Sequence, residues 1–286
     1  MPHSSLASPS ATISVLKRHG LYTRKSLGQH FLIDDNVVRR IVDLAGLAPG
    51  EPVLEVGPGI GTLTDALLGM SSPVVAVEYD TRLLPVLEEL SRPTGVLTVV
   101  HADAVTVEVE RLMTPAGPPV ALVANLPYAV AATVVLRFFQ EVPSLTRAVV
   151  MVQSEVADRM SAAPGTKAYG AYTVKLGLHA TPGARFAVPR SCFLPPPRVD
   201  SAVIRLDRAG RGLEPESLAA AARAADAAFT QRRKTLRNSL GAGLGISPAE
   251  ASALLEQAGI DGSVRAENVS VEEYIRLGGI LRERGH

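Results

Sequence analysis

Short apolar runs alternate with longer amphipathic segments from about Gly50 to Leu206. The runs are rich in β-branched residues, and this alternation is typical of a parallel β-sheet covered by helices on both faces. Residues 62–70 and 81–90 carry apolar side chains at helical spacing. The predicted strands are residues 52–56, 74–77, 97–100, 120–124, 147–152, 176–180 and 202–206. The pattern therefore predicts an α/β fold with a seven-stranded sheet.

The last two predicted strands differ from the others. No helical pattern separates them, and the segment that connects them is rich in proline and arginine. Parallel strands need a crossover connection, usually a helix, whereas antiparallel strands do not. We therefore expect an antiparallel hairpin at one end of the sheet, which departs from a plain dinucleotide-binding fold.

Beyond residue 207 the hydrophobic pattern becomes helical. A glycine- and arginine-rich stretch, residues 207–213, separates the two regions. Helices are predicted over residues 215–229, 232–240, 247–258 and 270–284, with Ser247 and Ser270 as N-caps. The Ser-, Pro- and Ala-rich start of the chain is typical of a flexible leader. We therefore expect a leader over residues 1–20, a first domain over 21–207 and a small helical domain over 213–286.

Composition favours a folded, soluble protein. With 286 residues and 47% hydrophobic content, the chain can bury a full core. Asn125, Pro127 and Arg137 interrupt the most apolar stretch, residues 118–139, which favours a buried strand and helix over a membrane span. No basic region leads into an apolar one at the N-terminus, and Cys192 is the only cysteine. We therefore expect a cytoplasmic protein without disulfides and without a bound metal.

Residues 55–61, with the sequence Glu-Val-Gly-Pro-Gly-Ile-Gly, follow a predicted strand and open a predicted helix. Glycine lets the backbone pass close to a ligand, because no Cβ stands in the way. The gaps between Gly57, Gly59 and Gly61 are narrower than in a dinucleotide-binding loop, and Pro58 lacks an amide donor. The loop therefore favours a small ligand that places no phosphate here.

Acidic residues follow the next two predicted strands. Glu78 can accept hydrogen bonds from both hydroxyls of a ribose, and Asp103 can accept one from the exocyclic amine of an adenine. A glycine loop alone is often a tight turn, and a strand-terminal acid is often a helix cap. Their order at successive strand ends favours a ligand, because ligands of open α/β sheets bind at the carboxyl edge. Together these residues predict a site for an adenosine without phosphates.

The tetrapeptide Asn125-Leu126-Pro127-Tyr128 falls at the end of the fourth predicted strand, on the same edge. An adenine amine is a poor nucleophile because its lone pair is delocalised, and acceptors on its N–H groups favour the pyramidal nitrogen that attack requires. The Asn125 side-chain carbonyl and the Leu126 backbone carbonyl can be these acceptors, while Tyr128 can stack on an extruded base. Methyl transfer from a sulfonium then requires alignment and no general base. The alternative is a buried proline turn with a core tyrosine.

Basic residues cluster in a chain whose net charge is only +1. One cluster comprises Arg232, Arg233, Lys234 and Arg237, and another comprises Lys17, Arg18, Arg24 and Lys25. Such clusters are often only solvated faces, but two that flank a base-binding site fit a track for RNA phosphates. Because only 4% of the residues are aromatic, we expect recognition through RNA shape and backbone, with one flipped base.

From about Leu21 to Leu281 the sequence resembles the ribosomal RNA adenine dimethyltransferases. The resemblance rests on residues 25–32, 55–61, 125–128, 193–201 and 229–238. It implies a Rossmann-like methyltransferase sheet and transfer of methyl groups from S-adenosylmethionine to N6 of two adjacent adenosines near the 3′ end of small-subunit RNA. Gln29, His30 and Leu32 would form a lip over the methionine half of the cofactor, and Phe193 would face the target base opposite Tyr128. The resemblance also implies a monomer that acts on an assembling ribosomal particle during ribosome biogenesis.

One position departs from the family pattern. Ala129 stands where members usually have asparagine, so that one polar group near the pocket is missing. This leaves the rate and the balance between first and second methylation open. A sister methyltransferase that modifies one large-subunit adenine and confers macrolide resistance is an alternative, as is a ribosome-assembly factor with secondary methylation. A nicotinamide dehydrogenase is disfavoured by the glycine spacing and by the lack of an acid for a hydride site.

Overall fold

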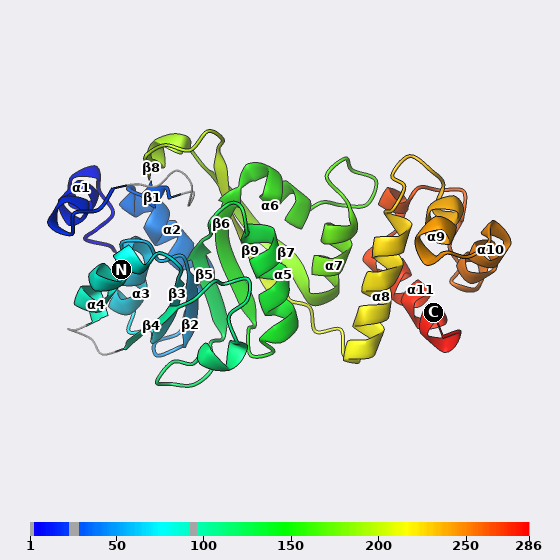
Figure 1. Cartoon of the computed structure of the whole chain (residues 1–286), viewed down its shortest axis with the longest axis horizontal. Helices are drawn as coiled ribbons and strands as arrows, with labels where there is room; N and C mark the ends of the chain where they lie inside the picture. The colour runs from blue at the N-terminus through cyan, green and yellow to red at the C-terminus, as the bar shows by residue number, and fades with distance from the viewer. Residues whose placement is uncertain (1–2, 23–28, 92–95, 286) are drawn as a thin grey trace. The chain divides into compact units, whose positions relative to one another are not determined.

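The computed structural model describes residues 3–22, 29–91 and 96–285, and the chain divides into two compact units (Figure 1). The sheet unit comprises Met1–Ala157 and Pro182–Arg208. The helical unit comprises Asp158–Thr181 and Ala209–His286. The helical unit thus takes in residues 158–181, which the sequence pattern assigns to the first domain.

A seven-stranded sheet with the order β4-β3-β2-β5-β6-β9-β7 forms the centre of the sheet unit. Its strands are β2 (Val53–Val56), β3 (Val74–Glu78), β4 (Leu97–His101), β5 (Ala121–Asn125), β6 (Arg147–Gln153), β7 (Ala180–Val188) and β9 (Ser201–Arg208). Strands β2 to β6 are parallel, and β9 runs antiparallel to β6. The predicted α/β fold is therefore confirmed. The carboxyl ends of β2, β3, β4 and β5 meet at one edge, which is where the candidate residues were expected to converge.

Both faces of the parallel strands are buried. Val53, Ala76 and Val123 belong to one apolar cluster with residues of α2 (Asp35–Ala45) and α3 (Thr62–Gly69). Leu54 and Leu122, which alternate with them along the strands, point to the opposite face and are fully buried as well. Burial on both faces explains why these strands are continuous apolar runs.

Further elements complete the sheet unit. These are α1 (Pro9–Arg18), α4 (Leu84–Ser91), α5 (Ala131–Glu141), the 3₁₀ turns η2 (Thr81–Leu83), η3 (Val109–Arg111) and η4 (Arg190–Cys192), and a small antiparallel pair of β1 (Phe31–Leu32) and β8 (Phe193–Leu194). Helix α6 (Ser154–Met160) begins in the sheet unit and ends in the helical unit. No helix in the parts of the chain that the structure describes is long and apolar enough to cross a membrane.

The helical unit has an apolar core of its own, to which Tyr169, Leu240 and Leu277 belong. Its helices are α7 (Ala171–His179), α8 (Pro215–Ala228), α9 (Leu236–Leu244), α10 (Pro248–Gln257) and α11 (Val271–Glu283), with the 3₁₀ turn η5 (Ala266–Asn268). Ser247 and Ser270 are N-caps, as predicted, and each forms a capping box with a glutamate. Local sequence thus determines where these two helices begin.

The apolar pattern predicts a strand over residues 176–180, but this prediction is wrong. Helix α7 runs through His179, and strand β7 begins only at Ala180. Val174 and Leu178 lie four residues apart on one helix face and are at most 1% exposed. A short apolar run can be a strand or part of a buried helix, and periodicity alone does not separate the two. The packing of the helical unit decides for the helix.

The N-terminal residues form a packed helix rather than the expected flexible leader. Ser8 caps α1 by accepting a hydrogen bond from the Ala11 amide, and Pro9 occupies its first turn. Val15 and Leu16 on this helix are buried. The Ser-Pro composition that is typical of a loop is here the start signal of a helix.

We predict opposite effects from adding a methyl group at two adjacent glycines of α11. A Cβ at Gly278 would overlap the backbone of Ala220 and Ala221 on α8, whereas a Cβ at Gly279 would meet nothing within 4 Å. Gly278→Ala should lower the free energy of unfolding by about 1–3 kcal/mol through overpacking. Gly279→Ala should raise it by about 0.5–1 kcal/mol, because alanine has the higher helix propensity. Denaturant unfolding of both variants measures this, and equal stability would contradict the close approach of the helices.

Candidate functional site

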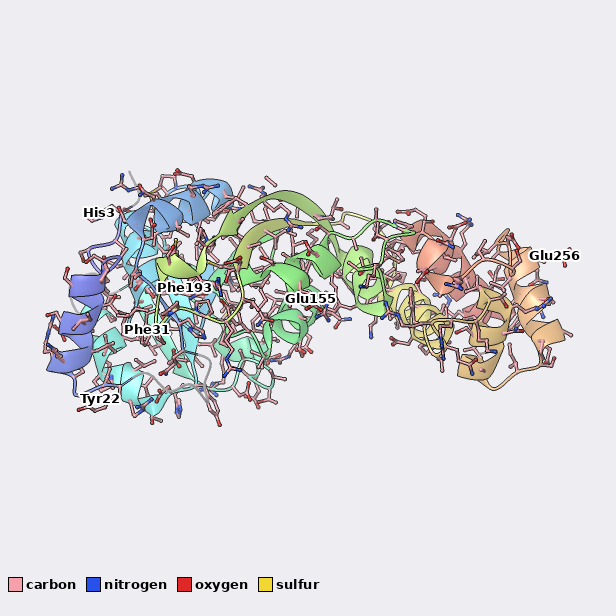
Figure 2. The ribbon with its side chains drawn as sticks, turned by 90° about the horizontal axis from the view of Figure 1, so that it is seen from above. His3, Tyr22, Phe31, Glu155, Phe193 and Glu256 are labelled. Atoms are coloured by element: carbon pink, nitrogen blue, oxygen red, sulfur yellow. The ribbon has the colours of Figure 1, made fainter. Side chains whose placement is uncertain are left out.

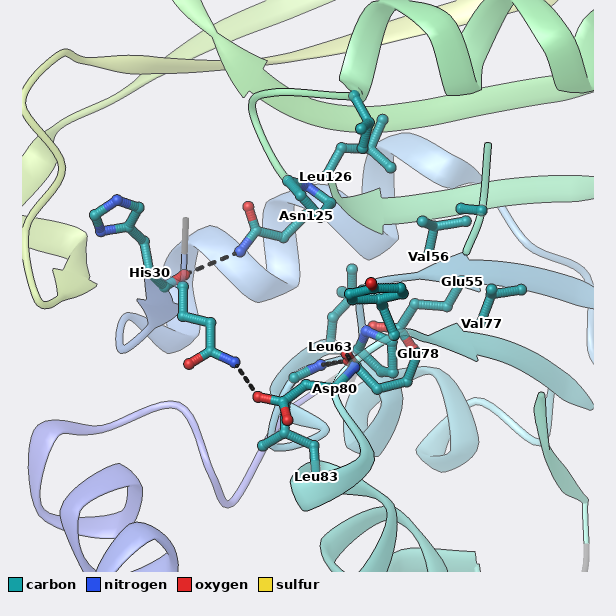
Figure 3. A pocket seen from close by; sticks show the side chains of 18 of the residues that line it. His30, Glu55, Val56, Leu63, Val77, Glu78, Asp80, Leu83, Asn125 and Leu126 are labelled. Carbon is teal, nitrogen blue, oxygen red and sulfur yellow. Dashed lines mark hydrogen bonds between the residues drawn. The ribbon is translucent and has the colours of Figure 1, made fainter. Parts of the chain in front are cut away.

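A cavity of about 610 Å³ opens at the carboxyl edge of the parallel strands (Figure 3). It is lined by Gln29, His30, Leu32, Gly57, Gly59, Glu78, Asp103, Asn125, Leu126 and Tyr128, which are residues that the sequence predicts for the site. Three segments supply most of them. We call residues 29–32 the strap, residues 57–61 the glycine loop and residues 125–128 the reaction segment. Cofactor and reaction residues predicted separately therefore share one cavity.

The glycine loop runs between the other two segments. Gly57 and Gly59 have φ angles of 67° and 62°, which L side chains rarely adopt. A Cβ at Gly57 would lie 3.2 Å from Cδ of Pro127, and a Cβ at Gly59 would lie 3.2 Å from Cε1 of Phe31. Both the backbone conformation and the crowding explain why glycine is needed at these positions.

Glu78 is the last residue of β3, and its side chain is held by the backbone around it. The Gly59 amide donates to Oε2 at 3.2 Å and the Asp80 amide donates to Oε1 at 2.8 Å. Glu78 is buried, and this burial raises the pKa of its carboxyl group. A carboxylate oxygen has two lone pairs, so that both oxygens can still accept a hydrogen bond from a ribose hydroxyl.

Glu55, which the sequence pattern did not single out, lies on β2 just before the glycine loop and is among the residues that line the cavity. The Thr64 hydroxyl donates to Oε2 of Glu55 at 2.6 Å. Complete burial raises the pKa of Glu55 to about 8. Near neutral pH, Glu55 is therefore mainly protonated, so it does not add a second buried negative charge to that of Glu78.

Asp80 links the strap to the end of β3, and the sequence pattern did not predict it as a site residue. Gln29 Nε2 donates to Oδ2 of Asp80 at 2.8 Å, and Arg82 Nε donates to Oδ1 at 2.9 Å. The hydrogen bonds from Arg82 lower the pKa of Asp80, so this carboxylate stays charged. Tyr79, beside it, lines the cavity with a side chain that is 63% exposed and offers a flat apolar face to a purine. A polar side chain two residues beyond a strand-terminal acid is a weak signal in the sequence.

Asp103 lies two residues beyond the end of β4 and also lines the cavity. Its Oδ1 accepts a hydrogen bond from the Val105 amide at 2.8 Å, so the side chain stabilises its own turn. Arg137 on α5 donates to the carbonyl of Ala104 at 2.9 Å and thereby holds the same turn. Asp103 is exposed, which leaves its second oxygen accessible to a ligand amine.

Asn125 is the last residue of β5, and its amide is oriented by the strap. Asn125 Nδ2 donates to the carbonyl of His30 at 3.3 Å (Figure 3). With the nitrogen committed in this way, Oδ1 is the group that can accept a hydrogen bond from a ligand. The neighbouring Leu126 side chain is buried, and its amide donates to the carbonyl of Met151 on β6. These contacts fix the backbone that carries the predicted acceptors.

Tyr128 presents a ring to the cavity, next to the strap. The rings of His30 and Tyr128 are stacked, with centroids 5.8 Å apart and 25° between their planes. The Tyr128 hydroxyl and the hydroxyl of Ser201 on β9 are 2.6 Å apart and hydrogen-bonded. Burial raises the pKa of Tyr128, so its phenol stays protonated at neutral pH. A bond to Ser201 and an uncharged phenol fit a positioned ring rather than a proton acceptor.

Phe193 does not line the cavity, unlike the other residues predicted for catalysis and cofactor binding. Its side chain is only 2% exposed and belongs to the same apolar cluster as Leu32. Strand β8, which carries Phe193, pairs with β1, which carries Phe31 and Leu32. Figure 2 labels Phe31 and Phe193, one from each strand of this pair. This core position differs from the expected place across the target base from Tyr128.

The basic residues Arg232, Arg233, Lys234 and Arg237 lie at the α8–α9 junction of the helical unit and are all exposed. In the sheet unit, Arg18 pairs with Glu89 at 2.8 Å, so part of the second basic cluster is engaged within the protein. Lys25 and Arg24 lie outside the described residues.

No group of three or more His, Cys, Asp or Glu side chains that could hold a metal occurs among the residues described.

Comparison with known proteins agrees with the geometry. The family model for ribosomal RNA adenine dimethylase matches residues 20–283. A ribosomal RNA small subunit methyltransferase A from Rhodococcus opacus is 44% identical over 282 residues, which cover 96% of this chain and 94% of the relative. Another of the same name, from Streptococcus thermophilus, is 39% identical and covers 98% of this chain and 99% of its own.

Two solved structures are similar over most of the chain. The 23S rRNA methyltransferase ErmE is 30% identical, has a TM-score of 0.66, and covers 88% of this chain and 99% of its own. A dimethyladenosine transferase from Plasmodium falciparum has a TM-score of 0.74 at 23% identity, covering 90% and 98%, and supports the fold alone. The resemblance seen in the sequence is therefore confirmed. This chain belongs to the ribosomal RNA adenine dimethylase family.

Proposed function

We propose that this chain transfers methyl groups from S-adenosylmethionine to N6 of two adjacent adenosines near the 3′ end of small-subunit ribosomal RNA. The observation that carries the proposal is the single cavity shared by the glycine loop, Glu78 and the reaction segment. Membership of the ribosomal RNA adenine dimethylase family supports the chemistry. The small-subunit substrate is supported by relatives named for that subunit at 39% and 44% identity, compared with 30% for the large-subunit enzyme ErmE.

The residues at the ends of β2, β3 and β4 fit the adenosine part of the cofactor. Glu78 would accept hydrogen bonds from the ribose hydroxyls, and Asp103 would accept one from the adenine amine. The bare backbone of Gly57 and Gly59 lets the ligand lie against the strand end. Gln29, His30 and Leu32 would cover the methionine end, as the family resemblance implies. The cofactor supplies an electrophilic methyl group on a positively charged sulfur.

The reaction segment would prepare the target nitrogen. Asn125 Oδ1 and the Leu126 carbonyl accept hydrogen bonds from the N6 protons and favour the pyramidal geometry in which the lone pair is available. The ring of Tyr128 holds the flipped base in line with the methyl group. The bound cofactor would supply the methyl group to N6 and keep the electrons of the broken C–S bond on its sulfur, and the surplus proton on N6 would leave to water. None of these steps asks Tyr128 to accept a proton.

RNA would be held by exposed basic side chains on the helical unit, namely Arg232, Arg233, Lys234 and Arg237. We place Lys25 in the same role. The natural substrate would be an assembling small ribosomal subunit in the cytoplasm, approached by a monomer. A second candidate function is that of a ribosome-assembly factor with weak methylation. Ala129 favours it, because this exposed residue of the cavity wall lacks the polar group that asparagine would supply there.

The decisive experiment is methylation of immature small subunits with radiolabelled S-adenosylmethionine, followed by mapping of the modified nucleotides. We expect label on N6 of two neighbouring adenosines near the 3′ end. Naked large-subunit RNA is the matched substrate for the ErmE-like alternative. Label there instead, or tight particle binding without label, would contradict the proposed activity.

We predict that Glu78 dominates cofactor binding in a pH-dependent way. Glu78→Ala should weaken S-adenosylmethionine binding by about 1.5–3 kcal/mol, as for a lost charge-assisted hydrogen bond. Because burial raises the pKa of Glu78, the wild-type affinity should fall as the pH is lowered, beginning at a higher pH than for an ordinary glutamate. Glu78→Gln should lack this component. Calorimetry between neutral and mildly acidic pH measures both effects, and identical profiles for wild type and Glu78→Gln would remove Glu78 from the site.

In the reaction segment, we predict different losses at Asn125 and Tyr128. Asn125→Ala should reduce turnover by a factor on the order of 100 with little change in cofactor affinity, as for a lost preorganised hydrogen-bonding group. Tyr128→Ala should weaken capture of the base by about 1–3 kcal/mol, whereas Tyr128→Phe keeps the ring and should be nearly silent. Steady-state kinetics with saturating cofactor separates the two. A Tyr128→Phe enzyme as inactive as Tyr128→Ala would instead assign a catalytic role to the hydroxyl.

We predict that the basic cluster of the helical unit determines how strongly the binding of the ribosomal particle depends on salt. Replacing Arg232, Arg233 and Lys234 with alanine should weaken particle binding and flatten its dependence on salt, by a slope of about 0.7–0.9 for each RNA phosphate that is no longer neutralised. Arg284→Ala, which removes an exposed arginine beyond α11, is the control. Binding titrations over a salt series measure the slope, and an unchanged slope in the triple variant would show that this face does not contact RNA.

A further inference from the structure

The N-terminal segment, residues 3–21, packs onto the helices that surround the cofactor side of the cavity. The Ser4 amide donates to Oδ1 of Asp35 on α2, and the Ser5 amide donates to Oδ2 of Asp65 on α3, both at 2.8 Å. Arg18 pairs with Glu89 on α4 at 2.8 Å. The family model begins at residue 20, so all of α1 lies before the matched region.

The buried face of α1 joins an apolar cluster that reaches the cavity wall. Val15 and Leu16 belong to one cluster with Phe31, Ile60 and Leu83. Phe31 and Leu83 line the cavity, and Ile60 lies in the glycine loop. Val15 and Leu16, which do not line the cavity, therefore belong to the same apolar cluster as two side chains of the cavity wall.

Phe31 connects this cluster to the groups that would bind the cofactor. Its ring lies so close to Gly59 that a Cβ there would be 3.2 Å from Cε1. The Gly59 amide in turn donates to Glu78. His30 directly precedes Phe31 in the sequence, and its carbonyl accepts the hydrogen bond that orients Asn125. A displaced Phe31 would thus disturb both the ribose carboxylate and the reaction amide.

We propose that the N-terminal segment is a positioning element of the cofactor site, in which Val15 and Leu16 act through Phe31, Ile60 and Leu83. The inference rests on the proposed function, because it assumes that this cavity binds S-adenosylmethionine. A packed interior transmits displacements of this kind, since its side chains have few voids into which they can relax. Val15 and Leu16 are positioning residues, because neither lines the cavity.

The test uses the full-length protein and a matched pair on α1. Leu16→Ala opens space in the cluster, whereas Ile13→Ala shortens a side chain that is 41% exposed on the same helix. Leu16→Met, which conserves volume, is the rescue variant, and Val15→Ala is a milder second variant should Leu16→Ala fold poorly. Calorimetry with S-adenosylmethionine, corrected to the folded fraction, gives the dissociation constant of each. Steady-state kinetics then gives the Michaelis constants for cofactor and ribosomal particle.

Leu16→Ala should raise the dissociation constant and the Michaelis constant for S-adenosylmethionine roughly threefold to tenfold, with Val15→Ala changed in the same direction. Ile13→Ala and Leu16→Met should remain close to wild type, and the Michaelis constant for the particle should not change. A lower melting temperature with unchanged cofactor affinity in Leu16→Ala and Val15→Ala would overturn the proposal, because α1 would then contribute only to the stability of the fold. If Glu78→Ala still weakens binding in that case, only the positioning role fails. Unchanged affinity in Glu78→Ala as well would overturn the proposed cofactor site.

Discussion

The close approach of backbone and side chain at Gly57 and Gly59 is the constraint on which the site depends. Pro127 of the reaction segment lies against the first glycine, and Phe31 of the strap lies against the second. Both glycines have positive φ, so a larger residue would be strained as well as crowded. The three segments can converge on one cavity because no side chain stands between them, and this convergence lets the Gly59 amide reach Glu78 and the His30 carbonyl reach Asn125.

Burial then decides which groups in the cavity carry charge. Glu55 is buried, its pKa is raised to about 8, and it accepts a hydrogen bond from the Thr64 hydroxyl, so it is mainly neutral near pH 7. Glu78 accepts two backbone N–H groups, which favour its ionised form against the cost of burial. Asp80 keeps its charge through Arg82. Negative charge thus concentrates at the end of β3, where a positively charged cofactor with a free ribose would lie.

The expectations that failed share a physical cause. Residues 176–180 are apolar in a way that suits either a strand or a buried helix, and contacts within the helical unit select the helix. The start of the chain has the composition of a leader, but Ser8 and Pro9 begin a helix whose apolar face has a partner cluster. In each case a distant partner outweighed the local pattern.

The sequence by itself determined the sheet, the helical end of the chain and most of the residues that line the cavity. It could do so because strand periodicity and glycine spacing are local, and because parallel strands bring their carboxyl ends to one edge. Only the tertiary structure decided that Glu55 is buried enough to hold a proton, that Asp80 ties down the strap through Gln29, and that α1 supports the cavity wall. These features join groups that are far apart in the sequence. Gln29 and Asp80, for example, are 51 residues apart, and a local sequence pattern carries no information about such a contact.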